Sequence, residues 1–257
     1  MTETEPLILL TNDDGIHADG LNCLRQAVEG LGDIRIVAPE SERSAIGHAI
    51  TLYEPIRVRE VNRNGSLYGH GVGGTPADAV KLAIYSLLPR KPDLVLSGIN
   101  NGANLGVNVF YSGTVSAAGE AAILGAPAIA LSLAQKLNPP FHYAVPHVRA
   151  LAEWALNSDL PPGVALSVNL PALPEKEVKG FKLTRQGLTK FKERYEKHED
   201  PRGNSYYWLS GETSPDHGDE ESDFHALRNG YVSVTPLFYD LTAHVHASDL
   251  GRSLEKL

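Results

Sequence analysis

Two adjacent aspartates, Asp13 and Asp14, follow a short apolar run near the start of the chain and could bind a cation. The apolar residues 7–10 are typical of a buried parallel strand, which places the polar turn 11–15 at its carboxyl end. Neighbouring carboxylates repel each other, and a hard cation held between them removes that repulsion. The alternative interpretation is a simple turn at Asp13-Asp14-Gly15, because Asp and Gly are common turn residues.

Turns after two later strands could supply further oxygen ligands. Ser44 follows the predicted strand 34–38, and Asn100 and Asn104 follow the predicted strand 94–97. Ligands of an open α/β sheet bind beyond the carboxyl ends of its strands, so we expect these turns to converge. Oxygen donors favour Mg²⁺ or Mn²⁺, and no His and Cys residues have the spacing of a zinc site. We therefore expect one divalent metal ion, either magnesium or manganese.

Small and hydroxyl residues at positions 111–114 precede an alanine-rich stretch with helical character. The backbone N–H groups and dipole of such a helix start can bind a phosphate. Ordinary capping by Ser112 or Thr114 explains the same residues. The stretch 73–76 could let a ligand approach the backbone, or it could be a simple turn in front of a helix predicted over 76–88. The residue types alone do not choose between a cap and a phosphate site.

Alternating strands and helices would position these turns. Strand patterns occupy residues 7–10, 34–38, 94–97, 128–132 and 164–169, and helical patterns occupy residues 20–31, 76–88, 116–124 and 142–157. This alternation predicts an α/β, Rossmann-like, mostly parallel sheet with helices on both faces. Residues 50–72 interrupt it with an antiparallel excursion, because Asn64-Gly65 is typical of a hairpin turn.

The C-terminal third has a different composition, since residues 181–240 are rich in Tyr, Arg, Asp and His. We divide the chain into an α/β catalytic core at 1–180 and a hairpin-bearing extension at 181–257, with a closing strand packed on the core. Aromatic side chains on such a polar stretch favour burial against another subunit. We expect a homodimer or homotetramer with Trp208 or its neighbours at the contact. The alternative is a hairpin folded back on its own sheet.

Composition and charge argue against several classes of protein. The chain has 257 residues, of which 42% are hydrophobic, so one large α/β domain can bury a full core. Its net charge of −8 and the lack of a basic run argue against binding to a nucleic-acid duplex. No apolar run approaches the ~20 residues of a membrane span, and the acidic start is unlike a signal peptide. Cys23 is the only cysteine, which fits a cytoplasmic protein.

Taken together, the motifs resemble those of the SurE (survival protein E) family. Residues 11–16 resemble the opening motif of the family and residues 37–48 resemble its second motif. Three more motifs match at residues 74–78, 97–104 and 111–115, and residues 230–237 are similar to the closing strand. Ordered motifs at matching spacing are specific, whereas any one of them alone would be weak.

The resemblance implies an acid-phosphatase-like 5′/3′-nucleotidase, which hydrolyses nucleoside 5′- and 3′-monophosphates to nucleoside and phosphate. It implies metal ligation by Asp13, Asp14, Ser44 and Asn100. It implies phosphate contacts from Asn104, Ser112, Gly113 and Thr114. It also implies dimers or tetramers with an exchanged C-terminal segment. The economical mechanism is attack by a metal-activated water, with Asp13 or Asp14 able to take the proton.

A Mg²⁺-binding receiver-like signalling module is an alternative from another class, because such modules also carry an Asp pair after the first strand. A receiver needs a phosphoacceptor Asp after its third strand and a Lys after a later one. In this chain the turn after the predicted strand 94–97 offers Asn100 in place of an aspartate, and no lysine ends the strand 128–132. An aspartyl-phosphate phosphatase needs Asp-x-Asp, whereas the two aspartates here are adjacent. Metal-dependent phosphate release separates the enzyme from the receiver.

Overall fold

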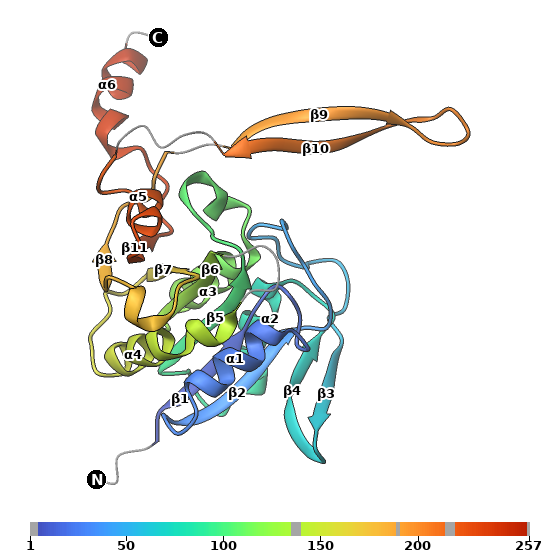
Figure 1. The fold of residues 1–257 in the computed structure, drawn as a ribbon, viewed down its shortest axis with the longest axis vertical. Coiled ribbons are helices and arrows are strands. Elements are labelled where there is room, and N and C mark those ends of the chain that lie inside the picture. Colours follow the sequence, from blue (N-terminus) through green and yellow to red (C-terminus); the bar gives the residue numbers. More distant parts are fainter. Residues whose placement is uncertain (1–4, 135–139, 189–190, 214–218, 256–257) are drawn as a thin grey trace.

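A nine-stranded sheet forms the body of the protein, with strand order β3-β4-β2-β1-β5-β6-β7-β11-β8 (Figure 1). The computed structural model describes residues 5–134, 140–188, 191–213 and 219–255. The strands of this sheet are β1 Leu7–Thr11, β2 Asp33–Pro39, β3 Val58–Arg63, β4 Ser66–Val72, β5 Leu94–Asn101, β6 Ala128–Ala134, β7 Val164–Pro171, β8 Phe181–Leu183 and β11 Val232–Phe238. All neighbours from β4 to β7 are parallel, which confirms the mostly parallel α/β sheet.

Helices cover both faces of the sheet because strand side chains alternate between them. Ile8 and Leu10 of β1 belong to the apolar cluster under α1 and α4, whereas Leu9 belongs to the cluster under α2 and α3. The helices are α1 Asp19–Ala27, α2 Pro76–Leu82, α3 Gly113–Ile123, α4 Val145–Leu156, α5 Asp223–Arg228 and α6 His244–Leu254. A π-helical turn η1 (Ala83–Leu87) extends α2, and η2 (Gly106–Phe110), η3 (Phe141–Tyr143) and η4 (Glu175–Glu177) are short 3₁₀ turns.

The predicted excursion before α2 is a hairpin of β3 and β4, which adds two strands to one edge of the sheet. Its turn residues Asn64 and Gly65 have φ values of +51° and +79°. A two-residue hairpin turn of type I′ requires positive φ at both positions, and Asn-Gly meets that requirement best. The Asn64-Gly65 turn is therefore where the sequence predicted it.

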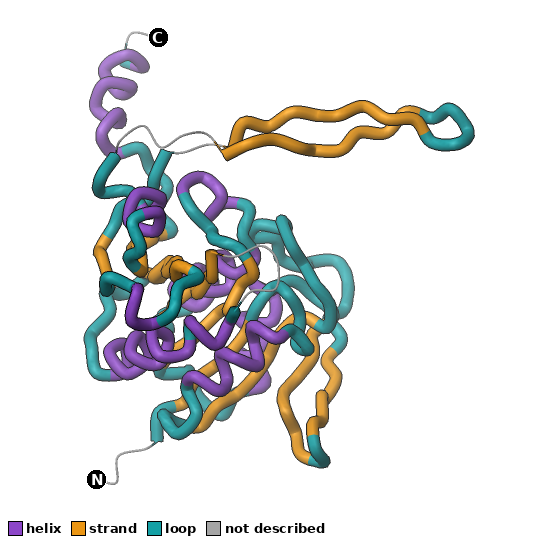
Figure 2. The backbone as a smooth tube through the Cα atoms, viewed as in Figure 1, coloured by secondary structure: helices purple, strands orange, loops and turns teal. Residues whose placement is uncertain are grey.

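The C-terminal third contributes both to the sheet and to a separate hairpin. Strand β11 pairs antiparallel with β7, and the short β8 pairs parallel with β11. Strands β9 (Phe191–Glu199) and β10 (Ser205–Thr213) pair only with each other among the described strands. Figures 1 and 2 show this β9–β10 hairpin extending away from the body of the protein, with α6 at another extremity. The hairpin is thus not folded back on the main sheet.

Candidate functional site

A polar cavity of about 420 Å³ lies at the carboxyl ends of β1 and β5. It is lined by Asp13, Asp14, Glu42, Ser44, Ala45, Asn100, Asn101, Ala103, Asn104, Asn108, Tyr111 and Ser112. The structure therefore brings together all of the sequence-predicted residues except Gly113 and Thr114. The position follows from parallel strands, whose carboxyl ends open on one edge of the sheet.

The turn after β1 presents the two aspartates to this cavity. Asn12 shapes the turn, because its side chain accepts the Gly15 N–H at 3.2 Å and donates to the Gly15 carbonyl at 3.0 Å. Gly15 has a φ of +100°, a conformation that favours glycine. The backbone N–H of Arg43 donates to the Asp13 carbonyl at 2.7 Å. That bond joins the aspartate turn to the loop that carries Ser44.

Burial and nearby negative charge make the two aspartates of the cavity costly to ionise. Burial raises the pKa of Asp13 by more than its hydrogen bonds from Thr114 lower it. Burial also raises the pKa of Asp14, to about 6, and the negative charges of Asp13 and Glu42 add to the increase. A nearby cation would reverse this effect, since opposite charge favours the ionised form. Hydrogen bonds offset only part of this cost, and the described lining residues include no Lys or Arg, so a bound cation would stabilise the ionised pair.

The first turn of α3 packs directly against Asp13. A Cβ atom added at Gly113 would lie 2.7 Å from the Asp13 Cβ, so the close approach requires glycine. Thr114 is fully buried, and its hydroxyl donates to the Asp13 carboxylate. Ser112 is the N-cap, and its hydroxyl accepts the Val115 N–H at 3.1 Å. Ser112 thus lines the cavity while also capping the helix, whereas the Thr114 hydroxyl faces Asp13 instead.

Two buried residues that the sequence analysis missed hold Asn104 in place. Asn169 accepts the Asn104 N–H at 2.8 Å and donates to its carbonyl at 3.1 Å. The Asn104 side-chain amide donates to the Ser132 hydroxyl at 2.9 Å. Ser132 and Asn169 lie toward the carboxyl ends of β6 and β7. Ligands of an open α/β sheet bind at the carboxyl ends of its strands, and applying this rule to β6 and β7 would have identified both residues.

The remaining candidate ligands each leave an oxygen that faces no described hydrogen-bond donor of the chain. The Asn100 side-chain N–H donates to the Gly102 carbonyl at 2.8 Å. The Ser44 hydroxyl donates to Glu42 at 2.6 Å, which brings a third carboxylate to the cavity. Asn108 and Tyr111 also line the wall, and the irregular segment η2 has no periodic pattern that could have predicted Asn108. Asn108 is therefore an addition from the structure, whereas Glu42 and Tyr111 lie in the segments 37–48 and 111–115 that the sequence had already indicated.

The donor set fits a hard divalent cation. Three carboxylates, four amides and three hydroxyls line the cavity, and no Lys, Arg or His side chain is among its described lining residues. In the described part of the chain no three His, Cys, Asp or Glu side chains form a metal cluster. Neutral oxygens must therefore complete the shell around Asp13 and Asp14, as hard cations accept. Arg43 is exposed and lies outside the cavity.

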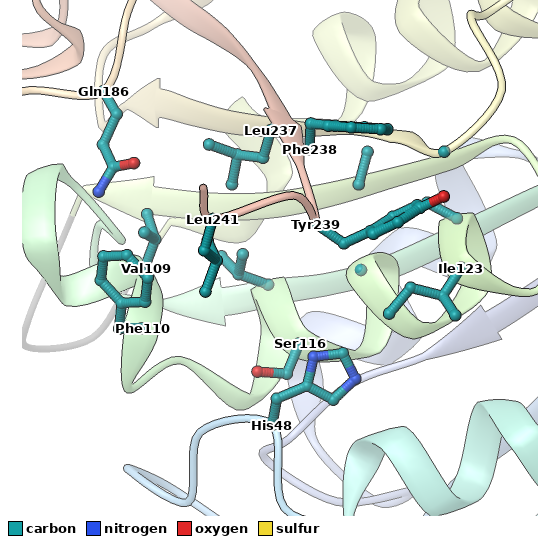
Figure 3. A pocket seen from close by; sticks show the side chains of 15 residues that line it. His48, Val109, Phe110, Ser116, Ile123, Gln186, Leu237, Phe238, Tyr239 and Leu241 are labelled. Atoms are coloured by element: carbon teal, nitrogen blue, oxygen red, sulfur yellow. The ribbon is translucent and has the colours of Figure 1, made fainter. Parts of the chain in front are cut away.

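A second cavity of about 310 Å³ is apolar and lies beside α3 (Figure 3). Phe110, Leu237, Phe238 and Tyr239 contribute to its wall, and Figure 3 shows His48 and Ser116 at another side. None of the carboxylates described above reaches it. Its described lining includes His48 but no carboxylate that could hold a cation beside a phosphate ester, so the polar cavity is the candidate active site.

Known proteins resemble this chain along nearly its whole length. The profile of the family described as survival protein SurE matches residues 8–193. The 5′-nucleotidase SurE of Syntrophobacter fumaroxidans is 48% identical over 245 residues, covering 95% of this chain and 98% of that protein. The 5′-nucleotidase SurE of Moorella thermoacetica is 45% identical, with coverages of 98% and 97%. The crystal structure of SurE protein from Aquifex aeolicus matches with a TM-score of 0.85 at 43% identity, covering 97% of this chain and 100% of that chain.

Proposed function

The chain belongs to the SurE family, and from this premise we propose that it is a metal-dependent phosphomonoesterase. It hydrolyses nucleoside 5′-monophosphates, and also 3′-monophosphates, to nucleoside and phosphate. The observation that carries the proposal is the lining of the polar cavity, which has three carboxylates and no basic side chain among its described residues. A phosphate ester is itself anionic and can approach such a surface only with a cation. The 5′-nucleotidase relatives support the nucleotide as the substrate.

One divalent ion, Mg²⁺ or Mn²⁺, would be held by Asp13, Asp14, Ser44 and Asn100. When bound, such a cation neutralises phosphate charge and lowers the pKa of the attacking water. All four side chains line the same cavity, and the Asn100 side-chain N–H is already bound to Gly102, which leaves its carbonyl oxygen for ligation. Oxygen donors of this kind suit either ion, so the donor set does not distinguish them.

The other residues would bind and orient the phosphate. The first turn of α3 offers the positive end of a helix dipole at Ser112 and Gly113, with no acidic residue in that turn. Asn104 is held from two sides by Asn169 and Ser132, which fixes its position at the wall. Asp14 is the less buried carboxylate of the pair, so it is placed to take a proton from water. Thr114 supports the site by holding Asp13.

A test of the activity uses the purified protein after removal of metal with EDTA. We expect phosphate release from AMP to be negligible without added metal and restored by Mg²⁺ or Mn²⁺. A matrix of the two ions against several nucleoside 5′- and 3′-monophosphates would establish ion and base preference. Metal-independent turnover, or a stable phosphoprotein in place of free phosphate, would contradict the proposal and favour the receiver-like alternative.

We also propose that residues 1–180 form the catalytic core and that residues 181–257 form an extension through which the chain assembles as a homodimer or homotetramer. The β9–β10 hairpin extends from the body with Tyr195, Tyr207 and Trp208 exposed by 70%, 59% and 64%. Exposed aromatic surface of this kind is favoured at subunit contacts. Light scattering should give at least twice the 27.7 kDa chain mass. A monodisperse monomer at micromolar concentration would contradict the assembly.

A cytoplasmic location is part of the same proposal. Cys23 is a free thiol, as expected in a reducing compartment. Among the helices that the structure describes, none combines the length and the apolar character needed to span a membrane. Fractionation of the native host cells, followed by detection of the protein in each fraction, would test the location.

A further inference from the structure

We propose that Asp223, assisted by Gln186, is a positioning residue that holds the wall segment 104–112 in the shape that binds substrate. Asp223 begins α5 in the C-terminal extension and does not line the cavity. The inference rests on the proposed function, because it assigns the extension a role in substrate binding at the same site. It makes the extension part of the catalytic unit as well as a surface for assembly.

The Asp223 carboxylate joins two distant pieces of backbone to the start of its own helix. It is 1% exposed and accepts the N–H groups of Gly106 at 2.8 Å, Gly187 at 3.0 Å and Phe224 at 2.8 Å. Gly106 is the first residue of η2, whereas Gly187 lies just ahead of the β9–β10 hairpin. One side chain thus ties the base of the hairpin to the segment beside the cavity.

Gln186, from the same part of the chain, adds a further bond to Gly106, and Asp223 and Gln186 together are called the clamp below. Its side-chain N–H donates to the Gly106 carbonyl at 3.0 Å, so both backbone polar groups of Gly106 are held by the extension. Gly106 has a φ of +54°, in the left-handed region that favours glycine. In Figure 1 the turn between β5 and α3 lies next to α5, in agreement with these bonds.

The clamped segment is a wall of the polar cavity and has little structure of its own. It carries Asn104, Asn108, Tyr111 and Ser112, all of which line the cavity. Its 3₁₀ turn η2 spans only five residues, and such short turns have poor hydrogen-bond geometry. The position of the wall therefore depends on contacts from outside the turn, and Asp223 and Gln186 supply two of them.

A carboxylate suits this role better than an amide. Two anionic oxygens can accept three N–H groups, whereas an Asn side chain has one acceptor oxygen and would point its own N–H₂ at a backbone donor. Burial raises the pKa of Asp223, and the three backbone bonds oppose that increase. A buried N–H group that loses its acceptor costs free energy, so Asp223→Asn should break the bond to Gly106 of η2 or the bond to Gly187 at the hairpin base.

Loss of the clamp should weaken the binding of substrate and leave the binding of the cation unchanged. The candidate cation ligands Asp13 and Asp14 follow β1 and Asn100 lies in β5, and their described contacts do not include Asp223. The phosphate and nucleoside side of the cavity, in contrast, is built from the clamped segment. This separation gives the proposal a signature that a general loss of structure would not share.

The experiment compares Asp223→Asn and Gln186→Ala in the full chain with the unchanged protein. We expect KM for AMP and Kd for inorganic phosphate, measured with saturating Mn²⁺, to rise about tenfold in Asp223→Asn and less in Gln186→Ala. The affinity for Mn²⁺ alone, measured by electron paramagnetic resonance, should change less than about twofold. Asp219→Asn is the matched control, because Asp219 lies nearby and its carboxylate pairs with the exposed Arg185.

The outcomes separate this inference from the proposed function. Absence of phosphate release by the unchanged protein contradicts the function, and phosphate binding by calorimetry then still reports on the clamp. Unchanged phosphate Kd in folded Asp223→Asn overturns the inference. So does a parallel loss of Mn²⁺ and phosphate affinity, because that is general disruption. If Asp223→Asn does not fold, Gln186→Ala becomes the test of the proposal. An unchanged Kd for phosphate in Gln186→Ala then overturns it.

Discussion

Helices α2 and α3 begin alike in sequence but differ in what faces their first turns. Each has a hydroxyl N-cap, Thr75 or Ser112, which accepts a backbone N–H three residues later at 3.0 or 3.1 Å. In α2 the carboxylate of Asp78 belongs to the same turn and accepts the Thr75 N–H at 2.9 Å. In α3 the first turn has no acidic residue and packs against Asp13 of another element.

The difference shows why the residue types alone could not identify a phosphate site. Asp78 also binds the backbone and hydroxyl of Thr51, so the positive end of α2 is compensated within a closed capping box. The start of α3 instead opens on a cavity at the carboxyl edge of the sheet, where Ser112 is part of the wall. A helix start can bind a ligand when its own side chains leave the dipole uncompensated.

The same substitution at two aspartates gives the largest expected contrast. Asp14→Asn should lower phosphate release on the order of 100-fold or more, because it removes a charge from the proposed cation site. Asp78→Asn should leave turnover per folded molecule unchanged and lower the free energy of unfolding by about 1–2 kcal/mol. Turnover at saturating Mn²⁺ and urea denaturation of both variants make the measurement. Near-full activity of Asp14→Asn would remove Asp14 from the site.

The two N-caps offer a subtler contrast. Ser112→Ala and Thr75→Ala both lose a capping bond, which should cost about 0.5–2 kcal/mol of stability in each case. Ser112→Ala should in addition weaken inhibition by inorganic phosphate about tenfold, because its hydroxyl lines the cavity. Melting temperature and phosphate inhibition, measured for both variants, distinguish the roles. If both proteins melt lower and bind phosphate normally, Ser112 is only a cap.

The core strands along the chain, and the sheet edge where most candidate residues lie, were predictable because both depend on short-range patterns. Apolar runs such as residues 7–10 identified the parallel strands, and the strand-end rule then brought Asp13, Ser44 and Asn100 to one edge. The predicted helix 116–124 began three residues late, because Gly113 is a poor helix former. Its position at the helix start is explained only by the contact with Asp13.

Contacts between distant segments were beyond a pattern-based analysis. The Thr114 hydroxyl looked like a phosphate ligand, but it meets Asp13, which is 101 residues away in the sequence. Asp223 reaches Gly106 across 117 residues, and an aspartate after a serine at a helix start predicts only a cap. Such roles depend on where the folded chain places two backbones, which composition and periodicity do not encode. Asp223 was therefore missed altogether.

The smallest expected effect concerns the ion pair that joins α3 to α2. Glu120 of α3 is buried and meets Lys81 of α2 at 2.5 Å and His48 at 2.8 Å. Burial raises the pKa of Glu120, but the hydrogen bonds from His48 and Lys81 and their charges outweigh burial and leave the pKa below its ordinary 4.5. A lowered carboxyl pKa contributes stability that is present above pH 4.5 and is lost as the pH falls through the lowered value.

Glu120→Gln should therefore reduce the free energy of unfolding by about 1 kcal/mol at pH 7, with little change in activity, since Glu120 does not line the polar cavity. The difference from the unchanged protein should shrink as the pH falls from 4.5 through the lowered pKa, below which Glu120 itself is neutral. Urea midpoints across pH 7 to 3.5 would measure it. Glu153→Gln is the matched control, because Glu153 pairs with Arg149 on the surface, where an ion pair contributes little. A difference that stays constant or widens toward acid would show that the Glu120 charge does not couple α3 to α2, and that packing alone holds the two helix starts in their different surroundings.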